Sequence, residues 1–356
     1  MICLTDLTSD DLVALIAELG QPSYRAKQLQ HWIYKELAAS YGQMSNIPKI
    51  LREKLARKAR ISRIKPVHES MAKDGTVKIL FSLLDGRTIE ASMMQHPAGK
   101  GKWRHTVCVS TQAGCALGCS FCATGQQGFE RNLWPGEIID QVIYFTRRMR
   151  HGVGVEVDAV PNVVFMGMGE PLANYDALMQ VIDILNSPDG LNIGARSMTV
   201  STAGLVPQIE RFSQEKRQVR LAISLHAAAD ALRNKLVPLN KRYPLEALMK
   251  SCRAYIETTG RRITFEYILF ENVNDSVQQA VELAALLKGM SCHVNLIAAN
   301  STDNKNFKPP VHNVVLAFQH ELERRHIPCT LRVSKGADIN AGCGQLRSRF
   351  LGTERG

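Results

Sequence analysis

From about residue 105 to the C-terminus, apolar strand-like runs alternate with segments of helical periodicity. The runs are HTVCVST, NVVFMGMG, SMTVSTAG, VRLAISLHA, ITFEYILF, CHVNLIAA and PCTLRVS. A helix signal follows the first run, where Pro135 precedes apolar residues spaced on one helical face, at Ile138, Val142 and Phe145. This alternation predicts an α/β fold with a parallel sheet curved or closed into a barrel.

Small polar residues stand where several of these runs end, in the segments GMGEP, STAG and SLHA. The carboxyl ends of the strands carry the site in βα barrels. Glycine lets the backbone approach a ligand closely, and a carboxylate can accept hydrogen bonds from a ligand ammonium. Each polar residue alone is better explained by ordinary hydrogen bonding. As a set they predict a ligand site, formed by Gly169, Glu170, Ser201, Ser224 and His226.

Three cysteines, Cys115, Cys119 and Cys122, lie within eight residues in the segment GCALGCSFCATG. Three thiolates are one fewer than a closed structural zinc site takes, whereas iron–sulfur clusters are held by cysteine thiolates. A cluster bound by three cysteines leaves one iron open to another ligand. The spacing therefore favours an iron–sulfur cluster, with zinc and a distant fourth ligand as the alternative.

The chain has nine cysteines, and its N-terminus lacks a basic and apolar signal segment. We therefore expect a cytoplasmic protein in which cysteines serve metal or redox chemistry. Cys343 lies between two glycines and is a candidate reactive thiol. Cys108 lies on the strand that leads into the cysteine loop, and it belongs either to the core or to the mouth of the site. The other four are expected to be inert: Cys3, Cys252, Cys292 and Cys329.

The first hundred residues have a different pattern. Residues 4 to about 60 show helical periodicity, with a helix start near Thr8. Between 66 and 97, the turn dipeptides Asp74-Gly75 and Asp85-Gly86 separate β-prone runs. The loop HPAGKGKWRH is the expected boundary before the barrel. The predicted domains are 1–60, helical; 61–100, a small β linker; and 101–356, the barrel with a C-terminal cysteine loop.

The net charge of +11 favours a polyanionic partner, and nucleic acid is the leading candidate. The densest basic segment is KILREKLARKARISRIK, in the N-terminal region. For any single one of these basic residues, a solvated helix face is a better explanation than a phosphate contact. The sequence contains no apolar run long enough for a transmembrane helix, so we expect no membrane association.

Several long segments resemble the RlmN/Cfr family of radical S-adenosylmethionine (SAM) RNA methyltransferases. The matching segments are SYRAKQLQHWIY, CVSTQAGCALGCSFCATGQQGFERNL, FMGMGEPLAN, STAGLVP, ISLHA, YILFENVND, HVNLIAAN and GADINAGCGQL. The resemblance implies a radical SAM partial (β/α)6-type barrel with a small N-terminal helical accessory domain for RNA. AGCALGCSFC and QQGFERN are more similar to the RlmN branch, which methylates adenine carbon 2, than to the Cfr branch, which methylates carbon 8.

The resemblance also implies a role for each candidate residue. Cys115, Cys119 and Cys122 would hold a 4Fe–4S cluster. Cys343 would carry a methyl group, with Cys108 as its redox partner and Glu90 as an active-site carboxylate. The SAM contacts would be Gly169, Glu170, Ser201, Ser224, His226 and Asn300.

The implied reaction consumes two SAM molecules per turnover. The first methylates Cys343, and the second yields a 5′-deoxyadenosyl radical that activates this S-methyl group for addition to the base. A Cys108–Cys343 disulfide then releases the product. The implied substrate is an adenosine of 23S ribosomal RNA, with transfer RNA as a second substrate. The implied partner is an electron donor such as flavodoxin or ferredoxin, and we expect a monomer.

Two alternatives remain open at this point. A carbon-8 methyltransferase of the Cfr type would use the same cysteines. A non-catalytic RNA-binding protein with a metal staple would need neither the GMGEP segment nor Cys343. The chain also has Ala299-Asn300-Ser301 where the family usually has a tryptophan-Asn-Pro or similar triplet, and Gly342 where alanine is more usual.

Overall fold

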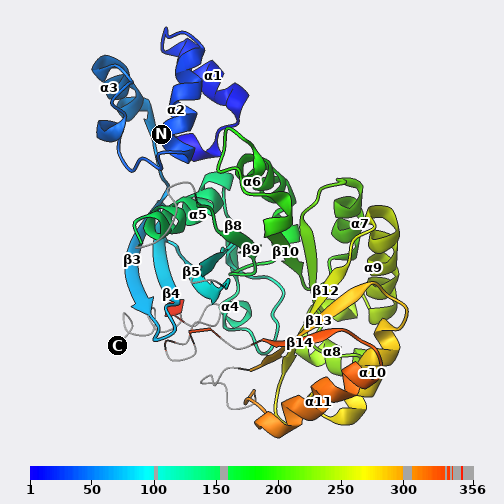
Figure 1. Ribbon diagram of the computed structural model, residues 1–356. Coiled ribbons are helices and arrows are strands. Elements are labelled where there is room, and N and C mark those ends of the chain that lie inside the picture. Colours follow the sequence, from blue (N-terminus) through cyan, green and yellow to red (C-terminus); the bar gives the residue numbers. More distant parts are fainter. Residues whose placement is uncertain are drawn as a thin grey trace.

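A computed structural model describes residues 1–99, 103–152, 159–299, 307–332, 335–336, 339 and 346–347. A bundle of short N-terminal helices lies beside a large curved sheet, and further helices cover the outer side of that sheet (Figure 1). Within the described part of the chain, every helix is too short or too polar to cross a bilayer.

The N-terminal bundle has its own small core. Its helix α1 begins at the predicted position, because the hydroxyl of Thr8 accepts from the backbone N–H of Asp11 and the Asp11 carboxylate accepts from that of Thr8. Leu12, Leu29 and Leu55 of the three helices are buried together. The helices are α1 (Ser9–Glu18), α2 (Tyr24–Tyr34) and α3 (Lys49–Lys58), and β1 (Ile2–Cys3) pairs in parallel with β2 (Ala59–Arg60).

The main sheet contains ten strands within the described residues, and seven of them run parallel in the order in which they occur along the chain. The expected strand–helix alternation is therefore confirmed. The parallel strands are β6 (Trp103–Cys108), β9 (Asn162–Phe165), β10 (Met198–Thr202), β11 (Arg220–Ser224), β12 (Ile263–Leu269), β13 (Cys292–Ala298) and β14 (Cys329–Arg332).

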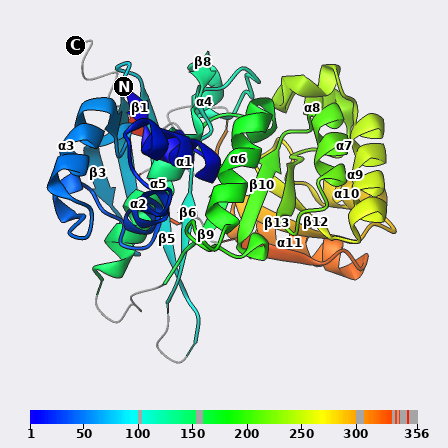
Figure 2. The same cartoon turned by 90° about the horizontal axis from the view of Figure 1, so that it is seen from above.

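Helices on the outer side of the parallel strands bury one face of the sheet (Figure 2). Tyr267 on β12 packs against Phe318 on α11 with ring centroids 5.3 Å apart, which is one such contact. The helices are α5 (Pro135–Arg150), α6 (Tyr175–Asn186), α7 (Val206–Gln214), α8 (Asp230–Leu236), α9 (Leu245–Thr259), α10 (Val277–Leu287) and α11 (His312–Arg324).

The β segment between the bundle and the barrel is part of the same sheet. Strands β3 (Ile64–Met71), β4 (Val77–Leu83) and β5 (Thr88–Pro97) form an antiparallel meander, as predicted, with turns at Gly75 and Gly86. The loop HPAGKGKWRH, where a boundary is expected, does not end the sheet, because β5 pairs antiparallel with β6 from Ser92 to Pro97. Backbone hydrogen bonding therefore joins this segment to the barrel, and the domain limits at 60 and 100 stay predictions.

Two aspartates fix the bundle to helix α5. Asp6 accepts from the backbone N–H of Gly136 at the start of α5 (2.8 Å) and forms an ion pair with Arg63 (2.5 Å). Asp140, one turn further along, accepts from the hydroxyl of Ser62 and the N–H of Arg63 (2.7 Å). Burial raises the pKa of Asp140 to about 7. The bundle is therefore attached through the helix that follows the cysteine loop.

Candidate active site

A cavity of about 390 Å³ lies at the carboxyl ends of the parallel strands. Side chains from the ends of β9, β10, β11, β12 and β13 line it, together with the loop that follows β6. Eight sequence-predicted site residues share this cavity: Cys115, Cys119, Cys122, Gly169, Glu170, Ser201, Ser224 and His226. The cavity therefore lies at the strand ends where a ligand site is expected, and its size is typical of small-molecule sites.

The cysteine loop is a compact unit inserted between β6 and α5. It contains β7 (Gln112–Gly114), the short helix α4 (Ala123–Gln126) and β8 (Phe129–Asn132). Gly114 has φ +74°, and a Cβ at this position would overlap the carbonyl oxygen of Gly128. That same carbonyl accepts from the N–H of Cys115 at 2.8 Å. Only glycine permits this close approach of β7 to the residue that precedes β8. The approach fixes the position of Cys115, the first of the three cysteines.

The three thiols face the cavity from within this loop. Burial raises the pKa of Cys115 to about 12 and also raises the pKa of Cys119 strongly. A cationic metal centre reverses this preference, because the thiolate is the form that ligates metals. Among the described residues no three His, Cys, Asp or Glu side chains are grouped as ligands of one metal ion. A 4Fe–4S cluster does not need three ligands on one ion, because each cysteine would bind a different iron. The three thiols therefore fit a cluster.

Glu170 is a buried carboxylate held by backbone donors. It accepts from the N–H of Ala203 (2.9 Å) and from that of Leu172 (3.2 Å). Burial outweighs these bonds and raises its pKa to about 7. Gly169 has φ +98°, and a Cβ there would lie 2.5 Å from the Cβ of Gln112. A ligand ammonium beside Glu170 would restore its ionised form, so this part of the cavity suits an amino group.

His226 contributes a neutral imidazole to the lining of the same cavity. Its Nδ1 accepts from the backbone N–H of Ile268 (3.1 Å), and burial lowers its pKa to about 3. The proton of the neutral ring is therefore on Nε2, which is left as a donor. The ring of Phe121, from the cysteine loop, lies edge-on to this imidazole with centroids 4.9 Å apart. Phe121 also contacts Phe270, so the loop and the barrel share an aromatic wall.

Two charged residues at the site were not singled out from the sequence. Glu266 lines the cavity, accepts from the side-chain amide of Asn295 (2.8 Å), and has a pKa raised by burial. The sequence feature that could have identified Glu266 is its position as an acidic residue inside the apolar run ITFEYILF. Arg233 donates to the carbonyl oxygens of Ala203 (2.7 Å) and Ser224 (3.2 Å), and so ties the ends of β10 and β11 together. Its burial depends on tertiary packing, which sequence periodicity does not reveal.

Cys108 and Glu90 lie at a second, smaller cavity of about 20 Å³. Lys78, Ala91, Ser92, Gly167 and Met168 complete its lining. Gly167 also lines the large cavity, so the two cavities adjoin at one residue. The structure thus brings Cys108 and Glu90 together at a cavity that adjoins the one lined by the three cysteines. Asn300 and Cys343 lie outside the described residues.

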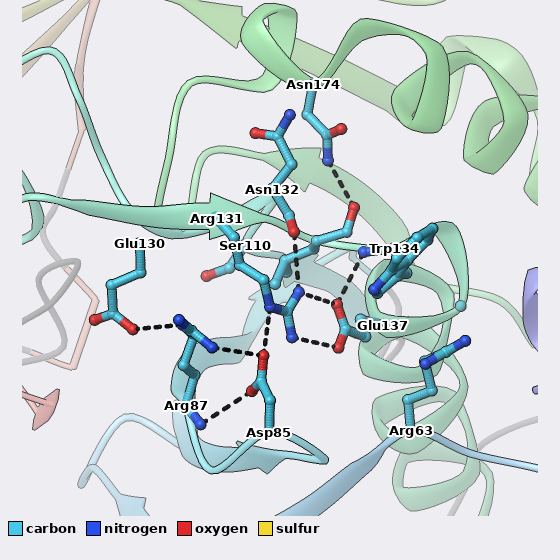
Figure 3. A network of polar contacts seen from close by, with 12 residues as sticks. Arg63, Asp85, Arg87, Ser110, Glu130, Arg131, Asn132, Trp134, Glu137 and Asn174 are labelled. Carbon is cyan, nitrogen blue, oxygen red and sulfur yellow. Dashed lines mark hydrogen bonds and ion pairs between the residues drawn. The ribbon is translucent and has the colours of Figure 1, made fainter. Parts of the chain in front are cut away.

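A chain of alternating charges connects the cysteine loop to its surroundings (Figure 3). Arg131 on β8 binds both carboxylate oxygens of Glu137 on α5, each at 2.8 Å, and also contacts Asp85 (2.6 Å). Arg87 contacts Asp85 (2.9 Å) and Glu130 (3.2 Å). Such a network holds β8 against both α5 and the turn between β4 and β5.

Arg347, near the C-terminus, extends this network. Its guanidinium pairs with Glu130 and donates to Gln127 (2.9 Å) and Thr88 (3.0 Å). Its backbone N–H donates to Glu90. Arg347, which follows Cys343 by four residues, is therefore anchored between β5 and β8.

Comparison with known proteins agrees with this geometry. Residues 2–61 match the family model "Ribosomal RNA large subunit methyltransferase N-terminal domain", and residues 109–284 match "Radical SAM superfamily". The probable dual-specificity RNA methyltransferase RlmN of Geobacillus kaustophilus is 45% identical over 343 residues, which cover 96% of this chain and 92% of that protein. The protein of the same name from Thermoanaerobacter sp. is 44% identical and covers 99% of both chains.

A solved structure shows the same fold. The crystal structure of a radical SAM methyltransferase from Sphaerobacter thermophilus superposes with a TM-score of 0.91 and 48% sequence identity, over 97% of this chain and 99% of that one. The expected fold class is therefore confirmed, and radical SAM membership implies a 4Fe–4S cluster and SAM. The chain belongs to the RlmN family of radical SAM RNA methyltransferases.

Proposed function

We propose that this chain methylates carbon 2 of an adenosine in 23S ribosomal RNA, with an adenosine of transfer RNA as a second substrate. The observation that carries the proposal is the pair of cavities that adjoin at Gly167. One is lined by the three cysteines and by five of the six proposed SAM contacts, and the other is lined by Cys108 and Glu90. A second RNA substrate, for which we propose transfer RNA, is supported by the words "dual-specificity RNA methyltransferase" in the names of the relatives.

The chemistry of the target explains why two adjoining sites are needed. Carbon 2 of adenine lies between two ring nitrogens and is too electron-poor to attack a sulfonium methyl group. The proposed route passes the methyl group to Cys343 first and adds it to the ring afterwards, consuming two SAM molecules. Covalent catalysis of this kind divides one inaccessible step into several feasible ones.

In the large cavity, Cys115, Cys119 and Cys122 would hold the cluster, which when bound supplies the electron that cleaves SAM. A flavodoxin or ferredoxin is the proposed source of that electron. Glu170 would accept hydrogen bonds from the amino group of SAM, and the Nε2–H of His226 would donate to an acceptor on the same ligand. The remaining proposed contacts are Gly169, Ser201, Ser224 and Asn300.

At the small cavity, Cys343 would carry the methyl group and Cys108 would release the product by forming a disulfide with it. Arg347 supports this pairing, because it follows Cys343 by four residues and its N–H donates to Glu90. Four residues of chain span at most about 14 Å. Cys108 is half-buried, which leaves part of its side chain accessible to a second sulfur.

The N-terminal bundle would bind RNA through its basic surface. Helix α3 has exposed basic side chains at Lys49, Lys54 and Arg57, and contacts of this type bind phosphates without reading sequence. A target base must leave its stack to reach a cavity inside the barrel, and backbone binding outside the cavity can hold the RNA meanwhile. The match of residues 2–61 to the ribosomal RNA methyltransferase domain supports this assignment.

The test is an assay of anaerobically reconstituted full-length protein on 23S ribosomal RNA fragments and on transfer RNA, followed by mass spectrometry of the nucleosides. We expect 2-methyladenosine from both RNAs. Cys343→Ala should give no methylated protein and no product, and Cys108→Ala should accumulate protein crosslinked to RNA. Cys329→Ala is the matched control, because this thiol lies against the carbonyl of Gln319 on α11.

Three results would contradict the proposal in different ways. 8-Methyladenosine would assign the carbon-8 reaction instead. Product from ribosomal RNA alone would remove the second substrate. A colourless, zinc-containing protein that binds RNA without modifying it would indicate a metal-stapled RNA-binding protein.

A further inference from the structure

A buried ion pair lies at the small cavity, and its lysine, Lys78, has no role in the function proposed so far. The ammonium of Lys78 is 2.6 Å from the carboxylate of Glu90, and the two side chains are only 2% and 3% exposed. Removing both charges from water is costly, and an apolar pair of similar size is often at least as stable. A pair retained at this depth therefore calls for an explanation other than stability.

The register of the sheet places this pair in line with Cys108. Lys78 on β4 lies opposite Ser92 on β5, and Ser92 lies opposite Cys108 on β6. Directly opposed residues project from the same face, and so does Glu90, two residues before Ser92. All four line the 20 Å³ cavity, which is about large enough for one water molecule. The ammonium, the carboxylate and the thiol therefore surround one small space.

Other groups around Glu90 fix its position. From the C-terminal segment, the backbone N–H of Arg347 donates to the second oxygen of the Glu90 carboxylate, and its guanidinium is directed to Glu130 of β8. The hydroxyl of Ser110 donates to the backbone carbonyl of Glu90 (2.5 Å). On β3, His68 lies in the same cross-strand row but is exposed. Among the residues that the structure describes, Lys78 is a buried cation whose ammonium contacts the carboxylate of Glu90 directly.

We propose that Lys78 is a positioning residue that keeps Glu90 ionised and directed at the space it shares with Cys108, so that Glu90 accepts the proton of the Cys108 thiol. This inference rests on the proposed function. Without the ammonium, a buried carboxylate binds a proton rather than remain charged. Glu90 would then be unable to take a second proton, and Cys108 would remain a thiol, which is a poor nucleophile.

The step that depends on Lys78 is release of the methylated base from the protein–RNA adduct. In this adduct a methylene carbon joins the sulfur of Cys343 to carbon 2 of the adenine ring. Glu90 takes the proton from the thiol, and the thiolate of Cys108 attacks the sulfur of Cys343. The sulfur–sulfur bond forms as the bond from that sulfur to the methylene carbon breaks. The electron pair of the broken bond remains on carbon, which takes up the proton from Glu90 and becomes the methyl group. The two cysteines are oxidised by two electrons, and the adduct is reduced by the same two.

The experiment follows a single turnover of the full-length reconstituted protein on a ribosomal RNA fragment, with the protein–RNA adduct measured on denaturing gels. Lys78→Met should methylate Cys343 normally and form the adduct, but release it about 100-fold more slowly. The slow release should accelerate as the pH is raised, because the uncompensated carboxylate then loses its proton. Lys78→Arg, which keeps the positive charge, should remain within about threefold of the parent protein.

A double variant separates this role from mere structural damage. Lys78→Met/Glu90→Gln removes both charges and so relieves the buried imbalance, yet release should be no faster than in Glu90→Gln alone. Recovery of release in the double variant would show that Lys78 only supports the fold, and would overturn the proposal. Lys250→Met, on the exposed face of α9, is the matched lysine control.

Further outcomes overturn the inference without touching the proposed function. One such outcome is release at the parental rate in Lys78→Met. Another is slow release in Lys78→Met that does not change with pH. In both cases the parent protein would still make 2-methyladenosine. If instead the parent protein with methylated Cys343 forms no adduct at all, the proposed function itself fails. Should Lys78→Met not fold, Lys78→Gln against Lys78→Arg provides the same comparison of charge at nearly constant size.

Discussion

The two adjoining cavities differ in how their buried ionisable groups are compensated. In the large cavity, burial shifts the titrating groups toward their neutral forms, raising the pKa of Glu170 to about 7 and lowering that of His226 to about 3. In the small cavity, Glu90 is accompanied at 2.6 Å by the ammonium of Lys78. The first site is suited to a ligand that brings its own charge, whereas the second is already paired within the protein.

This difference corresponds to the chemistry proposed for each site. SAM carries an ammonium and a carboxylate, so a cavity with neutral, buried partners gains interactions only when that ligand arrives. Disulfide formation between two cysteines needs a proton acceptor that is ready beforehand. An internal ion pair provides this, at the cost of burying two charges. Variants of Cys119, Lys78 and Glu170 test this contrast between the two cavities.

The largest effect is expected from Cys119→Ala. Loss of one of three proposed ligands should abolish the brown colour of the reconstituted protein and all methylation, including that of RNA. The free energy of unfolding of the cluster-free protein should change by no more than about 1 kcal/mol, because the small cavity and its ion pair are intact. Absorbance, iron content and denaturant unfolding check this. A variant that keeps its cluster would show that Cys119 is not a ligand.

The next effect concerns the ion pair itself. Lys78→Met should lower the free energy of unfolding by about 3 kcal/mol, because it leaves the carboxylate of Glu90 buried without its counter-charge. Adding Glu90→Gln should recover most of that loss. Urea unfolding of the three proteins measures both changes. Equal stability of Lys78→Met and the parent protein would mean that the pair is not buried in solution.

The smallest effect is a pH dependence in the large cavity. Because the pKa of Glu170 is about 7 before ligand binding, SAM must bind the ionised form in competition with a proton. Affinity for SAM should therefore level off above about pH 8 and fall about tenfold between pH 8 and pH 6. Glu170→Gln should bind more weakly at pH 8 and lose this dependence. Equilibrium dialysis with labelled SAM tests this, and an unchanged slope in the variant would exclude Glu170 as the titrating group.

Much of the large cavity was predictable because its residues lie in local segments. The three cysteines, GMGEP, STAG and SLHA each follow a strand, and parallel strands bring their carboxyl ends to one edge. Glu266 was missed because one acid in an apolar strand run does not reveal which face it occupies. The meander was predicted from its turns, Asp74-Gly75 and Asp85-Gly86.

The small cavity was much harder to predict, because it depends on the register between strands. Lys78 occurs in TVKILFSL, where a lysine suggests the solvent face of a strand. It is buried because β4 pairs with β5 so that Lys78 lies opposite Ser92, close to Glu90. The same long-range pairing joins the meander to β6, across the glycine-rich loop where a boundary was expected. A single sequence does not determine such pairings.

Gly167 has a consequence for the evolution and engineering of this enzyme. A Cβ at this position would lie 2.6 Å from the carbonyl oxygen of Val109, so even alanine would push β9 away from the chain that continues β6. Such a shift would move the large cavity, where SAM is proposed to bind, away from the small cavity that contains Cys108. Substitutions that enlarge the pocket for bulkier substrates should therefore be made at other positions, because Gly167 separates the two cavities and has no side chain that could be shortened.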